Sequence, residues 1–172
     1  MKAQPNPITI NDDGSIALEL TGGMLVLLDA EDYDKVREYR WHAIPGPHTV
    51  YAATSTYINK RVSVIRMHRL ILPVPKGIMI DHVNRNGLDN RKINIRPCTA
   101  LQNAWNAHRR SDNTSGYRGV RPRPGGIYQA CISACGKRIS LGYYNDPAIA
   151  ARAYDEAAKI HFGEFANLNF QD

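Results

Sequence analysis

The pattern that most constrains the fold lies in the last third of the chain, where three short strand-like segments precede one helix. The three segments are separated by glycine turns: Tyr117–Arg121, Ile127–Ser133 and Arg138–Tyr144. Asp146-Pro147 predicts the start of the helix, because Asp caps free N–H groups and Pro suits the first helical position. Small alanines on one face, before a stop at Gly163, allow this helix to lie close to a sheet. The pattern predicts a three-stranded antiparallel sheet packed on one helix.

The first sixty residues predict a separate mixture of strands and one short helix. Asp29 caps the helix expected over Ala30–Tyr39. The expected strands lie between turn-forming residues: Ile8–Ile10, Ile16–Leu20, Met24–Leu28, Val50–Tyr57 and, just beyond, Arg61–Ile65. Together with the C-terminal pattern, these elements place the chain in the α+β class, and no chemistry is assigned to residues 1–60.

A hairpin with a long polar loop is expected at the centre of the chain. Ile78–Val83 and Ile93–Arg96 have the pattern of its two strands. Thr99 and Gln102 form a capping box, so a helix should begin there and run to about His108.

These elements divide the chain into two expected domains. Residues 1–108 form the first domain, with the hairpin and helix as its core at about 78–108. The polar and basic segment 109–115 suits a linker, and residues 116–172 form the second domain.

The charge is unevenly distributed along the sequence. The chain has 172 residues and a formal net charge of +6, but residues 61–112 alone carry ten Lys or Arg against three Asp or Glu. Residues 113–144 carry five basic residues and no acid, whereas residues 1–60 and 145–172 are acidic on balance. This distribution is typical of a surface that meets a polyanion, although a scatter of solvated Lys and Arg would give the same counts.

Composition also argues against several classes of protein. The longest apolar run near the N-terminus, Met24–Leu28, is far shorter than the ~20 residues that span a bilayer. The first twenty residues hold polar and acidic groups, so no signal peptide is expected and a cytoplasmic protein is the default. The three cysteines, Cys98, Cys131 and Cys135, form no C-x-x-C pair, which argues against a disulfide framework and a structural zinc site.

Four polar residues of the hairpin and the following helix suit a metal-dependent phosphodiesterase site. Asp81 and the amide oxygen of Asn103 are hard ligands for Mg²⁺, which keeps several waters. His82 suits a general base, and Asn94 on the returning strand could fix its tautomer. Neighbours on a regular strand point to opposite faces, so Asp81 and His82 serve one centre only if the phosphate lies between them or the strand is irregular. A satisfied surface pair is the alternative.

Several motifs of the central region occur in a defined order: Met67–Leu72, Asp81–Asn84, Asn86–Arg91, Asn94–Arg96 and Gln102-Asn103. Over about residues 24–108, they resemble the signature of HNH homing endonucleases, which have the ββα-metal nuclease fold. The resemblance implies that His82 is the general base, Asn94 its orienting partner, and Asp81 and Asn103 the ligands of Mg²⁺, with Mn²⁺ as the alternative. The third letter of the signature is Asn103 here rather than His, a variant that is common in the homing group.

A second set of motifs follows: Asn113–Arg121, Leu141–Tyr144, Ala150–Asp155 and Ala166–Phe170. They resemble the AP-two/ethylene-response-factor DNA-binding domain, in which a three-stranded sheet lies in the major groove. The resemblance implies four base-contacting arginines: Arg118, Arg121, Arg123 and Arg138. Arginine suits this role because it can donate two hydrogen bonds to the major-groove edge of guanine. Four other positions that read bases in the family carry different residues here: Gly125, Cys131, Ser133 and Ser140. A looser base preference is therefore expected. Arg109 and Arg110 are expected to contact phosphates.

These observations predict a metal-dependent HNH endonuclease that hydrolyses phosphodiester bonds in double-stranded DNA, of the kind encoded by phages or mobile elements. A monomer would nick one strand, and a weak dimer could cut both. The alternative is a non-catalytic, sequence-specific DNA-binding regulator that retains a nuclease-like scaffold. The expected location is the cytoplasm of a bacterial host or a phage-infected cell.

Overall fold

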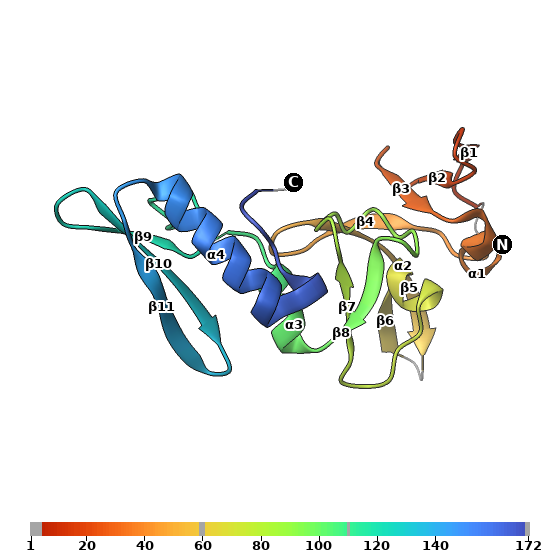
Figure 1. Cartoon of the computed structure of the whole chain (residues 1–172). Helices are drawn as coiled ribbons and strands as arrows, with labels where there is room; N and C mark the ends of the chain where they lie inside the picture. The colour runs from red at the N-terminus through yellow and green to blue at the C-terminus, as the bar shows by residue number, and fades with distance from the viewer. Residues whose placement is uncertain (1–4, 59–60, 110, 171–172) are drawn as a thin grey trace. The chain divides into compact units, whose positions relative to one another are not determined.

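The protein is described by a computed structural model, which covers residues 5–58, 61–109 and 111–170 (Figure 1). The chain divides into two compact units, Met1–Asn103 and Ala104–Asp172. The predicted α+β class is confirmed, because small antiparallel sheets and α-helices occur together in the described part of the chain. No helix among these residues is long and apolar enough to cross a membrane. The domain boundary predicted at residue 108 and the linker 109–115 stay predictions.

The first unit opens with a three-stranded antiparallel sheet in the order β1-β2-β3, formed by Ile8–Ile10, Ile16–Glu19 and Leu25–Leu28. A 3-10 turn, η1 (Ala30–Asp32), and a single-turn helix, α1 (Tyr33–Val36), follow. The helix predicted over Ala30–Tyr39 is therefore wrong in extent. The carbonyl of Val36 accepts from Tyr39 N (3.1 Å) and from the Trp41 indole (2.9 Å), so it does not continue an α-helical ladder.

A second sheet and a hairpin complete the first unit. The sheet has the order β4-β5-β6, formed by His42–Pro45, Val50–Ile58 and Arg61–Arg66, and α2 (Met67–Ile71) follows it. The hairpin pairs β7 (Met79–His82) with β8 (Ile95–Cys98), and α3 (Ala100–Asn106) follows β8. One apolar core joins β2, β3, α1, β5, α2, β7 and β8, and its largest buried side chains are Leu18, Leu20, Val26, Leu28, Val36, Trp41 and Met67.

The second unit contains the sheet and helix that the sequence predicts. The antiparallel sheet has the order β11-β10-β9, formed by Lys137–Tyr144, Ile127–Ala134 and Val120–Arg123. Helix α4 (Pro147–Phe162) begins where the Asp146 side chain accepts from Ala148 N (2.7 Å), and a 3-10 turn, η2 (Gly163–Phe165), ends it. The first strand starts at Val120 and not at Tyr117, because Gly116 and Gly119 adopt positive φ and keep the preceding segment in a turn.

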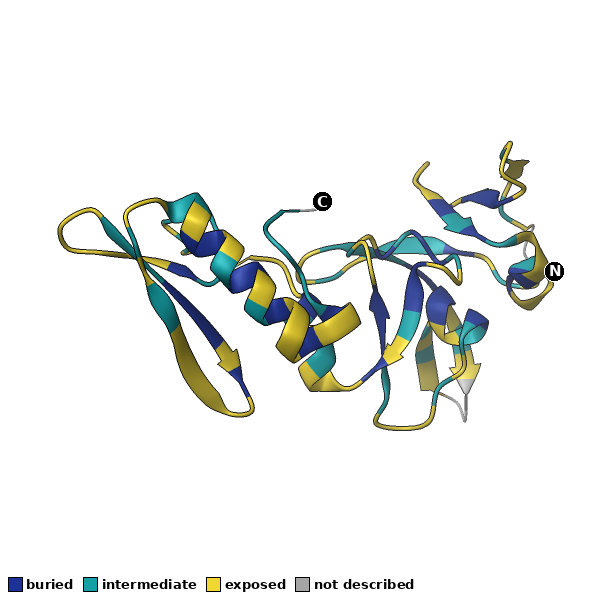
Figure 2. Cartoon of the chain, in the orientation of Figure 1, coloured by how far each residue is buried: buried dark blue, intermediate teal, exposed yellow. Residues whose placement is uncertain are grey.

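Helix α4 lies against one face of this sheet. Figure 2 shows buried residues along one side of α4 and exposed residues along the other. The buried side holds Tyr154, Ala158 and Phe162, which pack against Ile132 and Ala134 of β10. Small alanines, as predicted, allow this close approach.

Gly119 shows how tight the packing is. A Cβ atom at this position would lie 1.9 Å from the ring of Tyr154, and its φ of +74° disfavours any L side chain. We predict that Gly119→Ala destabilises the second unit by at least about 2 kcal/mol, from overpacking and left-handed backbone strain together. Gly125→Ala is the matched control, because its φ is +80° but nothing lies within 4 Å of the added atom. Urea unfolding of both variants measures the difference, and equal losses would contradict the packing argument.

Candidate active site and nucleic-acid interface

The last two residues of β7, Asp81 and His82, are both buried although both can ionise. In the hairpin, Asp81 lies opposite Arg96 and His82 lies opposite Ile95. The Asp81 carboxylate accepts from Arg96 Nε (3.0 Å) and Nη2 (2.9 Å). A buried carboxylate requires such a partner, because burial of an unpaired charge is strongly unfavourable.

Asn103 is placed by the start of α3. The predicted capping box forms, since Thr99 N donates to Gln102 Oε1 (2.8 Å) and Gln102 N donates to Thr99 Oγ1 (3.2 Å). Asn103 follows in the first turn, where its N–H donates to Thr99 O (3.0 Å), and its side chain is half-buried. The predicted ligands therefore lie on β7 and on the helix that follows its hairpin partner.

The two predicted metal ligands, Asp81 and Asn103, offer oxygen donors of the kind that Mg²⁺ accepts. No group of three or more His, Cys, Asp or Glu side chains that could hold a metal occurs among residues 5–58, 61–109 and 111–170. A cation here would rely on the Asp81 carboxylate and the Asn103 amide oxygen. One or two oxygen ligands suffice for Mg²⁺ because it retains water molecules, whereas zinc needs three or four protein ligands.

The amide of Asn94 holds the two ends of the loop between β7 and β8 together. Its Oδ1 accepts from Asn84 N (2.9 Å), and its Nδ2 donates to Asp89 O (2.7 Å). The Asn94 carbonyl also accepts from Val83 N (2.8 Å). These bonds close residues 83–94, here called the hairpin loop, into a fixed shape.

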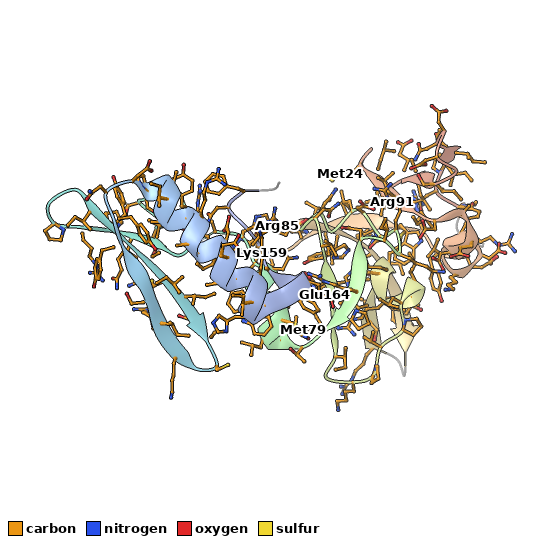
Figure 3. All side chains as sticks on the ribbon, viewed as in Figure 1. Met24, Met79, Arg85, Arg91, Lys159 and Glu164 are labelled. Carbon is orange, nitrogen blue, oxygen red and sulfur yellow. The ribbon has the colours of Figure 1, made fainter. Side chains whose placement is uncertain are left out.

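Asp89 strengthens the same loop from inside. Its carboxylate accepts from Arg91 Nε and Nη2, both at 2.8 Å, and from Asn84 Nδ2 (2.9 Å). The hydrogen bonds from Arg91 hold the pKa of the Asp89 carboxyl below its usual value. Figure 3 labels Arg91, which in addition reaches Asp13 near β2 (3.5 Å).

The N-terminal part of the unit anchors the hairpin loop. Leu27 of β3 donates to Leu88 O (2.8 Å) and accepts from Asn90 N (2.7 Å). Gly87 N donates to Thr49 Oγ1 (2.9 Å), and a Cβ on Gly87 would lie 2.5 Å from the Val50 carbonyl. Only glycine allows this close approach of the loop to the start of β5.

His82 is fixed by a neighbour from the hairpin loop. Its Nε2 lies 3.1 Å from Oδ1 of Asn90, which is almost fully buried. Asn90 points its Nδ2 toward Met67 Sδ (3.8 Å), so Oδ1 is the atom that faces the imidazole. Because an amide oxygen only accepts, His82 carries its proton on Nε2. Burial lowers the pKa of His82 below its usual value, which favours the neutral ring.

Two further rings enclose His82. The ring of His68 on α2 lies 5.1 Å from it, edge to face, and that of Tyr51 on β5 lies 5.9 Å from it. Tyr51 also contacts His68 (5.6 Å), and the Arg66 guanidinium lies 4.9 Å from the Tyr51 ring centre. Burial above all, with repulsion from His82 as a lesser cause, lowers the pKa of His68 to about 3.

The structure thus brings together some of the predicted site residues and adds others. Asp81 and His82 share the end of β7 but contact different partners, as the alternation of a strand requires. The amide that faces the His82 ring belongs to Asn90, whereas Asn94 braces the loop; an orienting contact from Asn94 stays a prediction. Asn90 and Tyr51 were not predicted. Asn90 stands in a run of polar residues that gives no sign of which one is buried.

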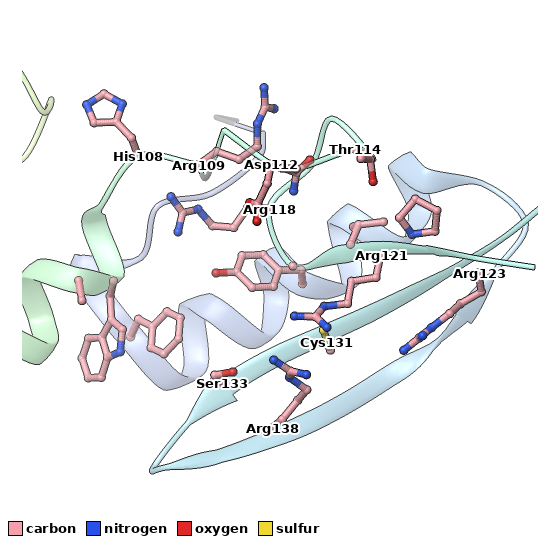
Figure 4. Close-up of a pocket in the computed structure, with 18 residues that line it drawn as sticks. His108, Arg109, Asp112, Thr114, Arg118, Arg121, Arg123, Cys131, Ser133 and Arg138 are labelled. Atoms are coloured by element: carbon pink, nitrogen blue, oxygen red, sulfur yellow. The ribbon is translucent and has the colours of Figure 1, made fainter. Parts of the chain in front are cut away.

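In the second unit, the predicted DNA-binding arginines gather around one cavity of about 780 Å³ (Figure 4). Arg121, Arg123 and Arg138 are exposed on the strands, and Arg118 and Arg109 line the cavity from the segment before β9. The lining is otherwise mixed, with Trp105, Tyr154 and Phe162 among its aromatic members. No acidic side chain other than Asp112 lines the described cavity, so its charge is strongly positive.

Two of these arginines already have backbone partners. The guanidinium of Arg118 donates to the carbonyl of Ala107, and that of Arg109 donates to the carbonyl of Gly116. Base reading by Arg118 would therefore require exchange of a bond, whereas the exposed Arg138 needs none. Arg110 lies outside the described residues.

The buried histidines predict that the fold weakens in mild acid. The unfolded chain binds a proton at His68 near pH 6.5, but the folded chain does so only near pH 3. The neutral His68 ring therefore makes its full contribution to the free energy of unfolding above about pH 6.5. Between about pH 6 and pH 3, protonation of His68 in the unfolded chain lowers the free energy of unfolding by about 1.4 kcal/mol per pH unit. Urea unfolding at several pH values measures this slope. His68→Gln should flatten it while the exposed His161→Gln should not, and an unchanged slope in His68→Gln would contradict the assignment.

Comparison with known proteins finds relatives of two kinds, a viral protein and a plant transcription factor. No family model matches the chain. Over 154 residues the chain is 26% identical to a protein of Acanthamoeba polyphaga mimivirus named Uncharacterized HNH endonuclease L560, covering 86% of this chain and 75% of that protein. Over 101 residues it is 37% identical to Ethylene-responsive transcription factor ERF069 of Arabidopsis thaliana, covering 55% of this chain and 61% of that factor.

A phage protein is a further relative of the chain. Over 97 residues, which are 56% of this chain, the sequence is 30% identical to Protein 3.8 of Escherichia phage T7. The match covers 79% of the phage protein. At this identity and coverage, the chain belongs to the same family as Protein 3.8 of phage T7.

Proposed function

We propose that the protein is a metal-dependent DNA endonuclease of the HNH type, in which the first unit cleaves and the second holds the duplex. The observation that carries this proposal is the buried pair Asp81 and His82 at the end of β7, beside a loop that fixes the imidazole. The similarity to the mimivirus protein named as an HNH endonuclease supports it.

His82 would act as the general base. In this role the imidazole, held by Asn90, would take a proton from the attacking water. Burial keeps the imidazole neutral at neutral pH, which is the form that a base requires. The enclosing rings of His68 and Tyr51 limit rotation of His82, so the base does not have to be reoriented in each turnover.

Asp81 and Asn103 would hold the divalent cation, Mg²⁺ or alternatively Mn²⁺. When bound, such an ion stabilises negative charge on the phosphate and on the departing oxygen. Arg96 shares the Asp81 carboxylate through two hydrogen bonds, so it holds this ligand in one orientation. The alternative is a DNA-binding regulator without catalysis, and the observation that favours it is this same engagement of Asp81 by Arg96.

The second unit would bind the duplex through its basic sheet face. Arg121, Arg123 and Arg138 lie on the sheet face opposite the one that packs on α4, so the apolar face of the sheet is covered while the charged face is open. Phosphate neutralisation by such residues supplies much of the affinity for DNA. The similarity of the chain to an ethylene-responsive transcription factor, over 101 residues, supports a DNA-binding role.

Cleavage is tested on supercoiled plasmid with Mg²⁺ and with chelator. The wild-type protein should convert the plasmid to nicked or linear DNA only with Mg²⁺. His82→Ala should lower the rate by about 10²-fold or more, because it removes the base, and should leave duplex affinity nearly unchanged. The exposed His161→Ala is the matched control and should cleave normally. A wild-type protein that binds duplex but never cleaves it would favour the regulator.

Duplex binding is tested by its dependence on salt. The logarithm of the affinity should fall linearly with the logarithm of salt concentration, with a slope of about −0.9 for each phosphate neutralised. Arg138 is exposed on the basic face, so it is expected to neutralise one phosphate. Arg138→Ala should therefore make the slope less steep by about 0.9. Arg37→Ala, which removes an exposed arginine paired with Asp34 in the first unit, is the control. A flat salt curve would contradict the proposed interface.

A further inference from the structure

Three polar side chains form a continuous hydrogen-bonded row across the sheet of the second unit. Arg123 on β9 donates to Gln129 Oε1 on β10 through both Nε (3.1 Å) and Nη2 (2.5 Å). Gln129 in turn donates from Nε2 to Ser140 Oγ on β11 (3.0 Å). The row joins all three strands, and Figure 4 shows Arg123 extending from β9 toward the other two.

The register places this row on the open face of the sheet. Gln129 pairs with Arg121 on one side and with Tyr143 on the other, and paired residues share a face. The neighbouring Ala130 and Ile132 belong to the opposite face, where they are buried in the contacts with α4. The hydrogen-bonded row therefore lies on the same surface as the predicted DNA-binding arginines.

The contact with Gln129 changes what Arg123 can do. An exposed arginine samples many rotamers and loses that freedom when it binds. Here one edge of the guanidinium, formed by Nε and Nη2, is held against a single acceptor. The edge formed by Nη1 and Nη2 is left without another hydrogen bond to the described residues. That edge has the fork of donors that matches O6 and N7 of guanine in the major groove.

We propose that Gln129 is a specificity-determining residue of this surface: it positions the Arg123 guanidinium for reading one guanine. The inference rests on the proposed binding of duplex DNA by the second unit. It adds a residue that the family resemblance does not supply, because the positions carried over from that resemblance are arginines. Gln129 acts through Arg123 and is a positioning residue in this account.

Ser140 has the complementary task of orienting the Gln129 amide. Its hydroxyl accepts from Nε2 and so keeps Oε1 directed at Arg123. If the amide turned over, Nε2 would face the guanidinium, and two donors would oppose each other. Loss of Ser140 Oγ should therefore weaken the same base preference as loss of Gln129.

The experiment selects duplexes from a randomised library with the full chain in chelator, so that cleavage does not interfere. The wild-type protein should enrich a site with guanine at a defined position. Gln129→Ala and Ser140→Ala should each reduce the discrimination at that one position by about 5-fold or more, with the salt slope unchanged. Ser140→Thr, which retains the hydroxyl, should preserve it. Ser55→Ala is the matched control, because it removes an exposed hydroxyl from β5 in the first unit without breaking a hydrogen bond to any described residue.

A double-mutant cycle on Gln129 and Ser140 tests whether Ser140 acts through Gln129. Gln129→Ala combined with Ser140→Ala should discriminate no worse than Gln129→Ala alone, since Ser140 acts through Gln129. If the losses of base discrimination in the two single variants add in the double variant, Ser140 does not act through Gln129, and the proposed positioning role is overturned. A variant that only damages the fold can be recognised, because it would lower the melting temperature and would weaken binding to every DNA sequence alike.

The mobility of Arg123 gives a readout that does not depend on DNA. Nitrogen-15 relaxation of its Nε–H group in the free protein should report a restrained side chain in the wild type and a mobile one in Gln129→Ala. A guanidinium that is equally mobile in both overturns the inference.

The outcomes separate this inference from the proposed function. If the wild-type protein selects a site and Gln129→Ala selects it with equal discrimination, the inference is overturned while the nuclease proposal stands. The same conclusion follows if the wild-type protein binds and cleaves duplex without any base preference. If the wild-type protein binds no duplex, both the inference and the proposed function are overturned.

Discussion

The amide group of Asn94 closes the hairpin loop, and the arrangement around His82 follows from that closure. Its two hydrogen bonds join residues from both ends of the loop, so the segment between them has little freedom. Asn90 lies within the closed segment and is therefore brought to the imidazole in one orientation. A loop without this tie would have to order Asn90 at an entropic cost, since fixing each residue of a flexible segment requires about 1–2 kcal/mol.

The same constraint gives the first sixty residues a role that their composition does not suggest. Leu27 of β3 bonds to the hairpin loop through both its backbone N–H and its backbone carbonyl. The Asp29 carboxylate accepts a further hydrogen bond from Lys92 N (2.7 Å), near the end of the loop. Lys92 also forms an ion pair with Glu31 (2.5 Å). The acidic excess of this region is therefore placed in part against the basic residues of the hairpin loop, where it neutralises them and supports the site.

Elements whose signals are local could be predicted from the sequence, and those that depend on distant contacts could not. The caps at Asp146 and Thr99 form as predicted because all their hydrogen bonds lie within a few residues. The expected helix over Ala30–Tyr39 fails because the Trp41 indole, packed in the core, takes the carbonyl of Val36. In the candidate site, Asp81 and His82 are adjacent in sequence, but Tyr51 reaches the His82 ring only through the packing of β5, which no spacing pattern reveals.

The enclosure of His82 has a consequence for the smallest fragment that could retain the site. Its walls come from Tyr51 and His68, which precede the hairpin and helix in the chain, and the loop is pressed against β5 where Gly87 meets the Val50 carbonyl. A peptide cut to residues 78–108 would keep every group assigned to the chemistry but would expose the imidazole to solvent and free its ring. Transplanting this motif into another scaffold would therefore require a recipient that rebuilds an aromatic wall on that side.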